Sequence, residues 1–270
     1  MRNSDNNNTR MWIFCDVVQY CTKLFWMVSG HLNEFESVMS ILKSFKSYFL
    51  KAKDLMVNLR NTFEISAVLS IIREYYEEIH CTGTRVVKSP QGSGHFMRGS
   101  KAVFYVIRDE ETTTWRDILI RELEKLRGSD SCLANKDIAV LVDVFQDEFE
   151  FKFDVIDSVL KRWKSTAEDK ITFHLVCKCL SAEWAGVIGI CNLYLQRSNS
   201  VTLPISYTTL HKNKKARLNY IISLLYIVIS RARVYSTVIL YNYKPKLCEY
   251  TDELLNILKQ RHDVCKVIEQ

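Results

Sequence analysis

Residues 138–145 read IAVLVDVF, an apolar run that only Asp143 interrupts. A strand with one face in water alternates polar and apolar side chains, whereas a continuous apolar run predicts a strand covered on both faces. Strands of that kind belong to parallel sheets with helices on each face. The run therefore favours an α/β fold.

The segments on either side of this run alternate in the same way. Towards the C-terminus the pattern predicts helices over 155–163, 218–233 and 250–260 and strands over 171–176, 187–195 and 236–243. Towards the N-terminus it predicts a strand over 101–108, helices over 33–58, 62–79 (with Thr62 as N-cap) and 113–127, a loop over 81–100 and a first strand over 11–16. Strands that alternate with helices predict a three-layer α/β fold, a mostly parallel sheet with helices on both faces.

Composition agrees with a globular α/β chain. The chain has 270 residues, 47% hydrophobic and 25% charged, and its 8 Gly and 3 Pro are too few for a tight-turned all-β fold. The net charge of +6 permits contact with polyanions but does not demonstrate it.

The nine cysteines are odd in number and irregularly spaced, which favours buried thiols over a disulfide framework or a zinc site. The longest apolar run, residues 220–230, is shorter than the roughly 20 residues that cross a bilayer. We therefore expect an intracellular protein, cytoplasmic or nuclear, with no membrane span and no bound metal of its own.

Residues 226–233 read YIVISRAR, a predicted helix that ends in Ser230, Arg231 and Arg233 just before a strand. An arginine held by a rigid element can direct its planar guanidinium at a phosphate. Basic residues in a last turn also cap carbonyls and complement the helix dipole. The residues alone leave both interpretations open.

Five stretches resemble, in the same order, the motifs of superfamily 1 helicases of the UvrD/Rep type. MWIFCDVVQ is similar to motif III, VNLRNTFEIS to motif IV, KDIAVLV to a strand of the second motor domain, ITFHLVCKCLSAEWAGVIGI to motif V and LYIVISRARVYSTVIL to motif VI. The succession of RNTFEI, SGHFMRG, DIAVLV and SRA is most similar to the helicase-like lobe of Schlafen and Schlafen-like proteins. The resemblance implies a RecA-like fold of the P-loop NTPase type.

The resemblance also implies roles for individual residues. In such motors ATP and magnesium lie between two RecA-like domains, and the second domain supplies arginines that stabilise the transferring γ-phosphoryl group. Arg60 and Arg231 would be those arginines, and Glu183 would approach the ribose. Asp16 and Gln19 would act from motif III, where Gln19 senses the γ-phosphate. His174 and Lys178 of motif V would face the nucleic acid.

The sequence also departs from these motifs. It contains no GxxxxGK[ST] loop and no Walker B pair, and residues 94–101 (GHFMRGSK) transpose Lys and Ser ahead of a strand. In motif V, Ser181 and Ala182 stand where Gly and Leu are usual, and Lys178 is displaced relative to His174. Asp143, followed by Val144, reads as a strand-end acid.

We therefore expect residues 1–50 to be a remnant of a first RecA-like domain with connecting helices, and residues 51–270 to be the second domain. ATP and Mg would bind only with a complementary first RecA-like domain, in cis or in trans. A fragment, one half of a split protein and an inactive paralogue are all compatible with this pattern.

Two basic clusters are candidates for contact with single-stranded DNA or RNA. One is HKNKKAR, residues 211–217, with Lys214 and Lys215, and the other is residues 161–164, which include Trp163. Phosphate neutralisation combined with base stacking is how proteins bind single strands without reading sequence. Solvated helix ends would give the same clusters.

Two functions follow as expectations. The first is the C-terminal motor lobe of an ATP-dependent helicase or translocase, which would not hydrolyse ATP alone. The alternative is a catalytically inactive RecA-like module that binds RNA, DNA or protein. A Rossmann-type enzyme is disfavoured because no strand is followed by GxGxxG.

Overall fold

Six parallel strands form the centre of the protein in the computed structural model, which describes residues 57–58, 60–80, 92–93, 97–107, 112–128, 133–143, 149–161, 170–176, 179, 182–192, 214–241 and 249–270. The strand order is β5-β4-β6-β7-β3-β8, and every neighbouring pair is parallel. The strands are β3 (Ala102–Val106), β4 (Ile138–Val142), β5 (Thr172–Leu175), β6 (Trp184–Asn192), β7 (Ala232–Tyr241) and β8 (Cys265–Glu269).

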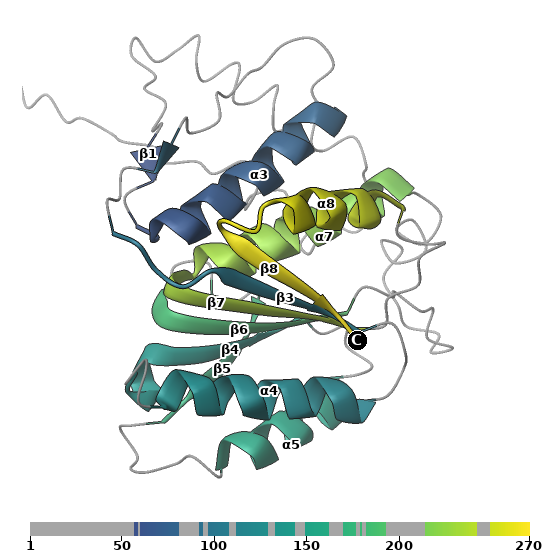
Figure 1. Ribbon diagram of the computed structural model, residues 1–270. Coiled ribbons are helices and arrows are strands. Elements are labelled where there is room, and N and C mark those ends of the chain that lie inside the picture. The colour runs from purple at the N-terminus through teal and green to yellow at the C-terminus, as the bar shows by residue number, and fades with distance from the viewer. Residues whose placement is uncertain are drawn as a thin grey trace, which may run out of the picture.

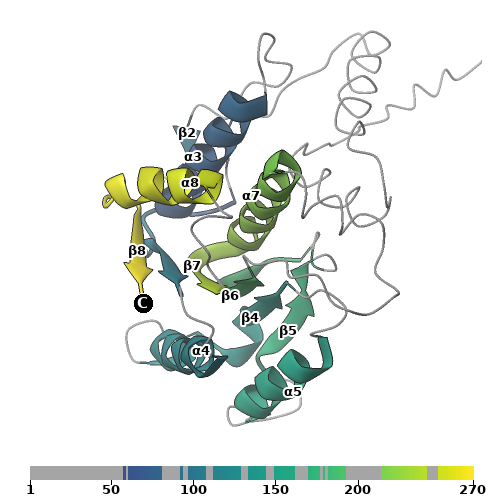
Figure 2. The same ribbon diagram turned by 90° about the vertical axis from the view of Figure 1, so that its right-hand side faces the viewer.

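Helices cover both faces of this sheet. One face carries α3 (Phe63–His80), α7 (Lys214–Ser230) and α8 (Glu249–Gln260), and the other carries α4 (Thr112–Arg127) and α5 (Phe149–Leu160) (Figure 1). The view turned by 90° separates the same two helix layers (Figure 2). The predicted three-layer α/β class is confirmed.

The strand sequences explain the two layers. In β4, Ile138, Val140 and Val142 belong to the core under α4 and α5, whereas Ala139 and Leu141 belong to the core under α3, α7 and α8. All five residues are fully buried. The continuous apolar run is thus two alternating sets of side chains, one for each face.

The chain order explains why both faces are covered. From β3 to β5 the chain moves outward along the sheet through α4 and α5, and from β6 to β8 it moves in the opposite direction through α7 and α8. Crossovers between parallel strands share one hand, so a reversal of direction puts the later helices on the opposite face.

Several predicted boundaries are wrong. The helix predicted to reach 233 ends at Ser230, and β7 already begins at Ala232, so Arg233 belongs to a strand. The β-branched residues of the stretch VISRARVYSTVI are compatible with a helix or with a strand. The pairing of β7 with β6 decides where the helix ends and the strand begins. Helix α5 begins at Phe149, six residues before the predicted start.

Two strand pairings were missed. Cys265–Glu269 forms the edge strand β8 beside β3, after the last strand that the pattern predicted. Residues Val57–Asn58 form β1, paired with β2 (Gly92–Ser93), where a helix and a loop were predicted. Elements this short carry too few residues to show a period, so their pairing partners define them.

The predicted side-chain cap of α3 is also wrong. Within the described residues, the Thr62 hydroxyl is buried and has no hydrogen-bond partner. The Thr62 carbonyl accepts the hydrogen bond of Ser66 N at 2.9 Å, which starts the helix. The Phe63 amide donates to the Met97 carbonyl at 3.1 Å, so a neighbouring segment satisfies this end of α3.

The described ranges contain neither a membrane-spanning helix nor a cluster of metal-ligating side chains. None of the helices there is both long enough and apolar enough to span a membrane. No group of three or more His, Cys, Asp or Glu side chains is arranged there to hold a metal ion. The expected domain boundary near residue 50 and the strand over 11–16 lie outside the described residues.

Candidate functional site

Three of the predicted site residues come together at the amino-terminal edge of the sheet. Arg60 precedes α3, Glu183 precedes β6, and Arg231 joins α7 to β7. Arg60 Nε lies 2.6 Å from Glu183 Oε1, and Arg231 Nη1 donates to the Ala182 carbonyl at 3.4 Å. We call Arg60, Glu183 and Arg231 the arginine cluster.

The packing of α7 determines where Arg231 lies. A Cβ on Gly189 of β6 would collide with the Val228 side chain, so glycine lets α7 approach the sheet closely. The Arg231 amide still donates to the Ile227 carbonyl at 3.2 Å, and the Arg231 carbonyl accepts from Trp184 N at 3.0 Å. Arg231 is thus the single residue at which the helix ends and the β6–β7 pairing begins.

Asn61 connects Arg60 to Arg231, a role that the sequence analysis missed. Its side-chain amide donates to the Ala232 carbonyl at 2.5 Å and to the Ser230 carbonyl at 3.4 Å, the residues on either side of Arg231. Asn61 is only 1% exposed. Asn61, the residue after Arg60, therefore fixes the backbone on both sides of Arg231. The available signal was its place beside Arg60 in the motif IV stretch.

The two arginines of the cluster differ in their exposure to solvent. The Arg60 side chain is 48% exposed and that of Glu183 32% exposed, whereas Arg231 is 2% exposed. Arg231 Nε and Nη2 donate to Ser230 Oγ at 3.3 and 3.1 Å. A buried guanidinium needs such hydrogen bonds because it has lost its hydration. Arg60 is accessible to a ligand in this state, whereas Arg231 binds the protein itself.

His174, predicted to face nucleic acid, lies on β5 beside Trp184, with ring centroids 5.2 Å apart. Burial lowers the pKa of His174 below its usual value. The neutral imidazole is therefore favoured at pH 7, and any contact made by His174 would depend on hydrogen bonding or stacking rather than on charge.

Two other predicted residues, Lys214 and Lys215, do not join the arginine cluster. Lys214 and Lys215 begin α7, and its 17 residues put them about 24 Å from Ser230 at the other end. Asp16, Gln19, Trp163 and Lys178 lie outside the described residues.

Asp143 follows β4 at the opposite, carboxyl-terminal edge of the sheet, where it is buried. Its charge adds to the effect of burial, which raises the pKa of the Cys191 thiol well above its usual value. The strand-end position predicted for Asp143 is the one observed.

Comparisons with known proteins give structural likenesses but no match in sequence. No family model matches the chain, and no curated protein does. A solved structure with a similar fold is the C-terminal domain of a possible DNA helicase from Lactobacillus plantarum WCFS1, 12% identical, with 78% of this chain and 98% of that chain covered and a TM-score of 0.43. At this identity and TM-score the likeness carries no argument about what this chain does.

Proposed function

We propose that this chain is the C-terminal motor lobe of an ATP-dependent superfamily 1 helicase or translocase, similar to Schlafen-like helicase domains. A first RecA-like domain, in cis or in trans, would complete the motor. The observation that carries the proposal is the arginine cluster: motifs IV, V and VI were matched on sequence independently, and their Arg60, Glu183 and Arg231 meet at one edge.

Each residue then has a chemical role. ATP and Mg would be held by the first domain, and the Arg60 guanidinium would reach across to the γ-phosphoryl group, where a positive fork stabilises charge in the transition state. Glu183 would accept hydrogen bonds from the ribose once Arg60 leaves it. Arg231 would reach the phosphates only if its contact with the Ala182 carbonyl opens, so Arg60 is the first arginine to test.

The test is ATP hydrolysis by the chain mixed with a first RecA-like domain that carries a Walker A loop. Replacing Arg60 by Ala should lower turnover by about 10³-fold or more, as removal of an arginine finger does. Arg116→Ala, on the opposite face of the sheet in α4, is the matched control. Turnover within a few fold of the unaltered pair would reject the role of Arg60.

The second candidate is the catalytically inactive RecA-like module for RNA, DNA or protein. One observation favours it: both arginines already have protein partners, Arg60 in Glu183 and Arg231 in Ser230 and Ala182. This module would bind a single-stranded oligonucleotide or a protein, and no first domain would induce ATP turnover. Turnover that depends on Arg60 would exclude it.

A further inference from the structure

Arg231 holds the backbone on both sides of Glu183. Before Glu183, the Ala182 carbonyl accepts a hydrogen bond from Arg231 Nη1 at 3.4 Å. After it, the Trp184 amide donates to the Arg231 carbonyl at 3.0 Å. Because Arg231 is buried, this anchor lies inside the protein. The Glu183 side chain therefore extends from a backbone that has little freedom to move.

The backbone next to Arg60 is held in a comparable way. Asn61, the following residue, is buried and donates its side-chain hydrogen bonds to the Ser230 and Ala232 carbonyls. The Arg60 and Glu183 side chains meet between these two anchored stretches, with Nε 2.6 Å from Oε1. The contact can therefore open by rotation of the two side chains, without a change in the fold.

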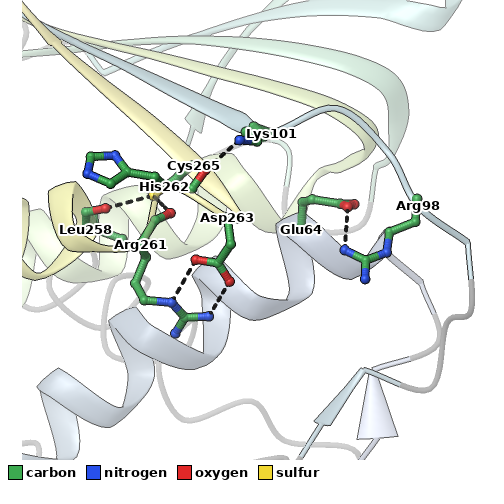
Figure 3. Close-up of polar contacts among 8 residues, drawn as sticks. All are labelled: Glu64, Arg98, Lys101, Leu258, Arg261, His262, Asp263 and Cys265. Atoms are coloured by element: carbon green, nitrogen blue, oxygen red, sulfur yellow. Dashed lines mark hydrogen bonds and ion pairs between the residues drawn. The ribbon is translucent and has the colours of Figure 1, made fainter.

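A second carboxylate–arginine pair shows by contrast what a permanent contact requires. Figure 3 shows Glu64 and Arg98 facing each other, with Nη1 3.4 Å from Oε1. The Glu64 side chain is only 5% exposed, and the Gly99 amide also donates to its Oε2 at 2.7 Å. Glu183 is 32% exposed, and among the described residues its carboxylate contacts Arg60 alone. Glu64 is thus held by the fold, whereas Glu183 is held by Arg60 and can exchange its partner.

The charges decide which kind of ligand opens the pair. The carboxylate 2.6 Å away neutralises the Arg60 guanidinium, so a singly charged anion gains little by approaching it. Both side chains also remain in contact with water, where an ion pair contributes little. A polyphosphate carries several charges and offers paired oxygens to a guanidinium. The pair therefore lowers the affinity of Arg60 for any anion by a modest factor, which a polyphosphate can overcome.

We propose that Glu183 is an autoinhibitory contact, which occupies Arg60 until a polyphosphate displaces it. This regulation rests on the proposed function, because it concerns the arginine that would act on the γ-phosphoryl group. It adds that the chain holds this arginine inactive by itself, before a first domain brings ATP. The role of Glu183 at the ribose would begin only after the displacement.

The experiment measures how fast phenylglyoxal, a reagent that condenses with guanidinium groups, labels Arg60 in the full chain. Mass spectrometry of peptides reads each arginine separately, and Arg98 is the internal reference because its own carboxylate partner is not altered. Glu183→Gln removes the charge and keeps the shape and a hydrogen-bond acceptor. Labelling of Arg60 should then rise about two- to fivefold, the range for an exposed ion pair, and labelling of Arg98 should not change. Glu124→Gln, exposed on α4 at the opposite face, is the matched control.

Inorganic tripolyphosphate, added in increasing amounts, tests the ligand. It should protect Arg60 from the reagent, and half-protection should need about two- to fivefold less tripolyphosphate in Glu183→Gln than in the unaltered chain. Raising the ionic strength should narrow the difference in labelling rate between these two chains, because salt screens an exposed pair. Glu183→Ala removes the contact altogether and should raise labelling as Gln does. Melting temperatures show whether each variant keeps the fold.

Each contrary result has a distinct meaning. Equal labelling of Arg60 in the unaltered chain and in both Glu183 variants rejects the autoinhibitory contact. A higher half-protecting concentration in Glu183→Gln also rejects it, because Glu183 would then orient Arg60 towards the anion. No protection by tripolyphosphate in any of these chains rejects a polyphosphate as the ligand that displaces Glu183. None of these measurements needs a first domain or ATP turnover, so faster labelling without Arg60-dependent turnover would retain the contact and reject the proposed function.

Discussion

Replacing Asn61 by Ala tests how the arginine cluster is held together. The Asn61 amide group donates to two carbonyls, at 2.5 Å to Ala232 and at 3.4 Å to Ser230, and the residue is 1% exposed. Alanine removes the donor of both buried hydrogen bonds. An unsatisfied buried acceptor costs about 1 to 3 kcal/mol. The second contact is long, so we expect the free energy of unfolding to fall by about 2 to 3 kcal/mol in all.

Asn61→Asp is the matched variant, nearly the same in shape. It replaces the donor by a carboxylate that faces two carbonyl oxygens, which adds a buried charge to the lost hydrogen bonds. We therefore expect Asp to destabilise the chain more than Ala at pH 7, even though Asp is the closer isostere.

Urea unfolding followed by circular dichroism measures both variants, and equal m-values would show that the unfolded states are comparable. A loss below about 0.5 kcal/mol for Ala, the size of an ordinary surface substitution, would refute the reasoning. So would an Asp variant as stable as the original chain. Either result would mean that Asn61 does not hold the backbone around Arg231.

Three more predictions follow from burial and packing. Gly189→Ala should destabilise the chain by about 1 to 3 kcal/mol because its Cβ meets Val228, and an unchanged urea midpoint would contradict the close packing of α7. Burial lowers the pKa of His174, so the unfolded state binds more protons just below pH 6.5 and stability should rise with pH through that range. His174→Gln should flatten this part of the profile, and an equally steep profile would contradict the assignment. Burial raises the pKa of Cys265 to about 11 and that of Cys191 well above its usual value, so iodoacetamide at pH 8 should label both only after unfolding. Peptide mass spectrometry reads the result, and rapid native labelling would show that the thiols are accessible.

The strands could be predicted wherever they are covered on both faces. Residues 138–142 show a continuous apolar run because alternate side chains enter two cores, and that signal is local. The edge strand β8 has only exposed or half-buried residues after its first, so CKVIE shows no comparable run. Its identity as a strand depends on pairing with β3.

The members of the candidate site could be named from motif resemblance, but their arrangement could not. Arg60, Glu183 and Arg231 stand in three separate stretches, and nothing in those stretches states that Arg60 reaches Glu183 or that Arg231 is buried. The same holds for Asn61, whose partners are carbonyls 169 and 171 residues away.

The sequence by itself therefore determined the α/β class, most of the helices and strands, and which arginines to examine, because apolar periodicity and motif order are properties of neighbouring residues. Tertiary structure alone decided that α7 stops at Ser230, that Arg231 faces Ala182 while Arg60 remains accessible, and that the Met97 and Arg233 carbonyls accept hydrogen bonds from the start of α3. Each of these depends on backbone groups brought together by crossovers and strand register, and those contacts form only when both sheet faces are packed.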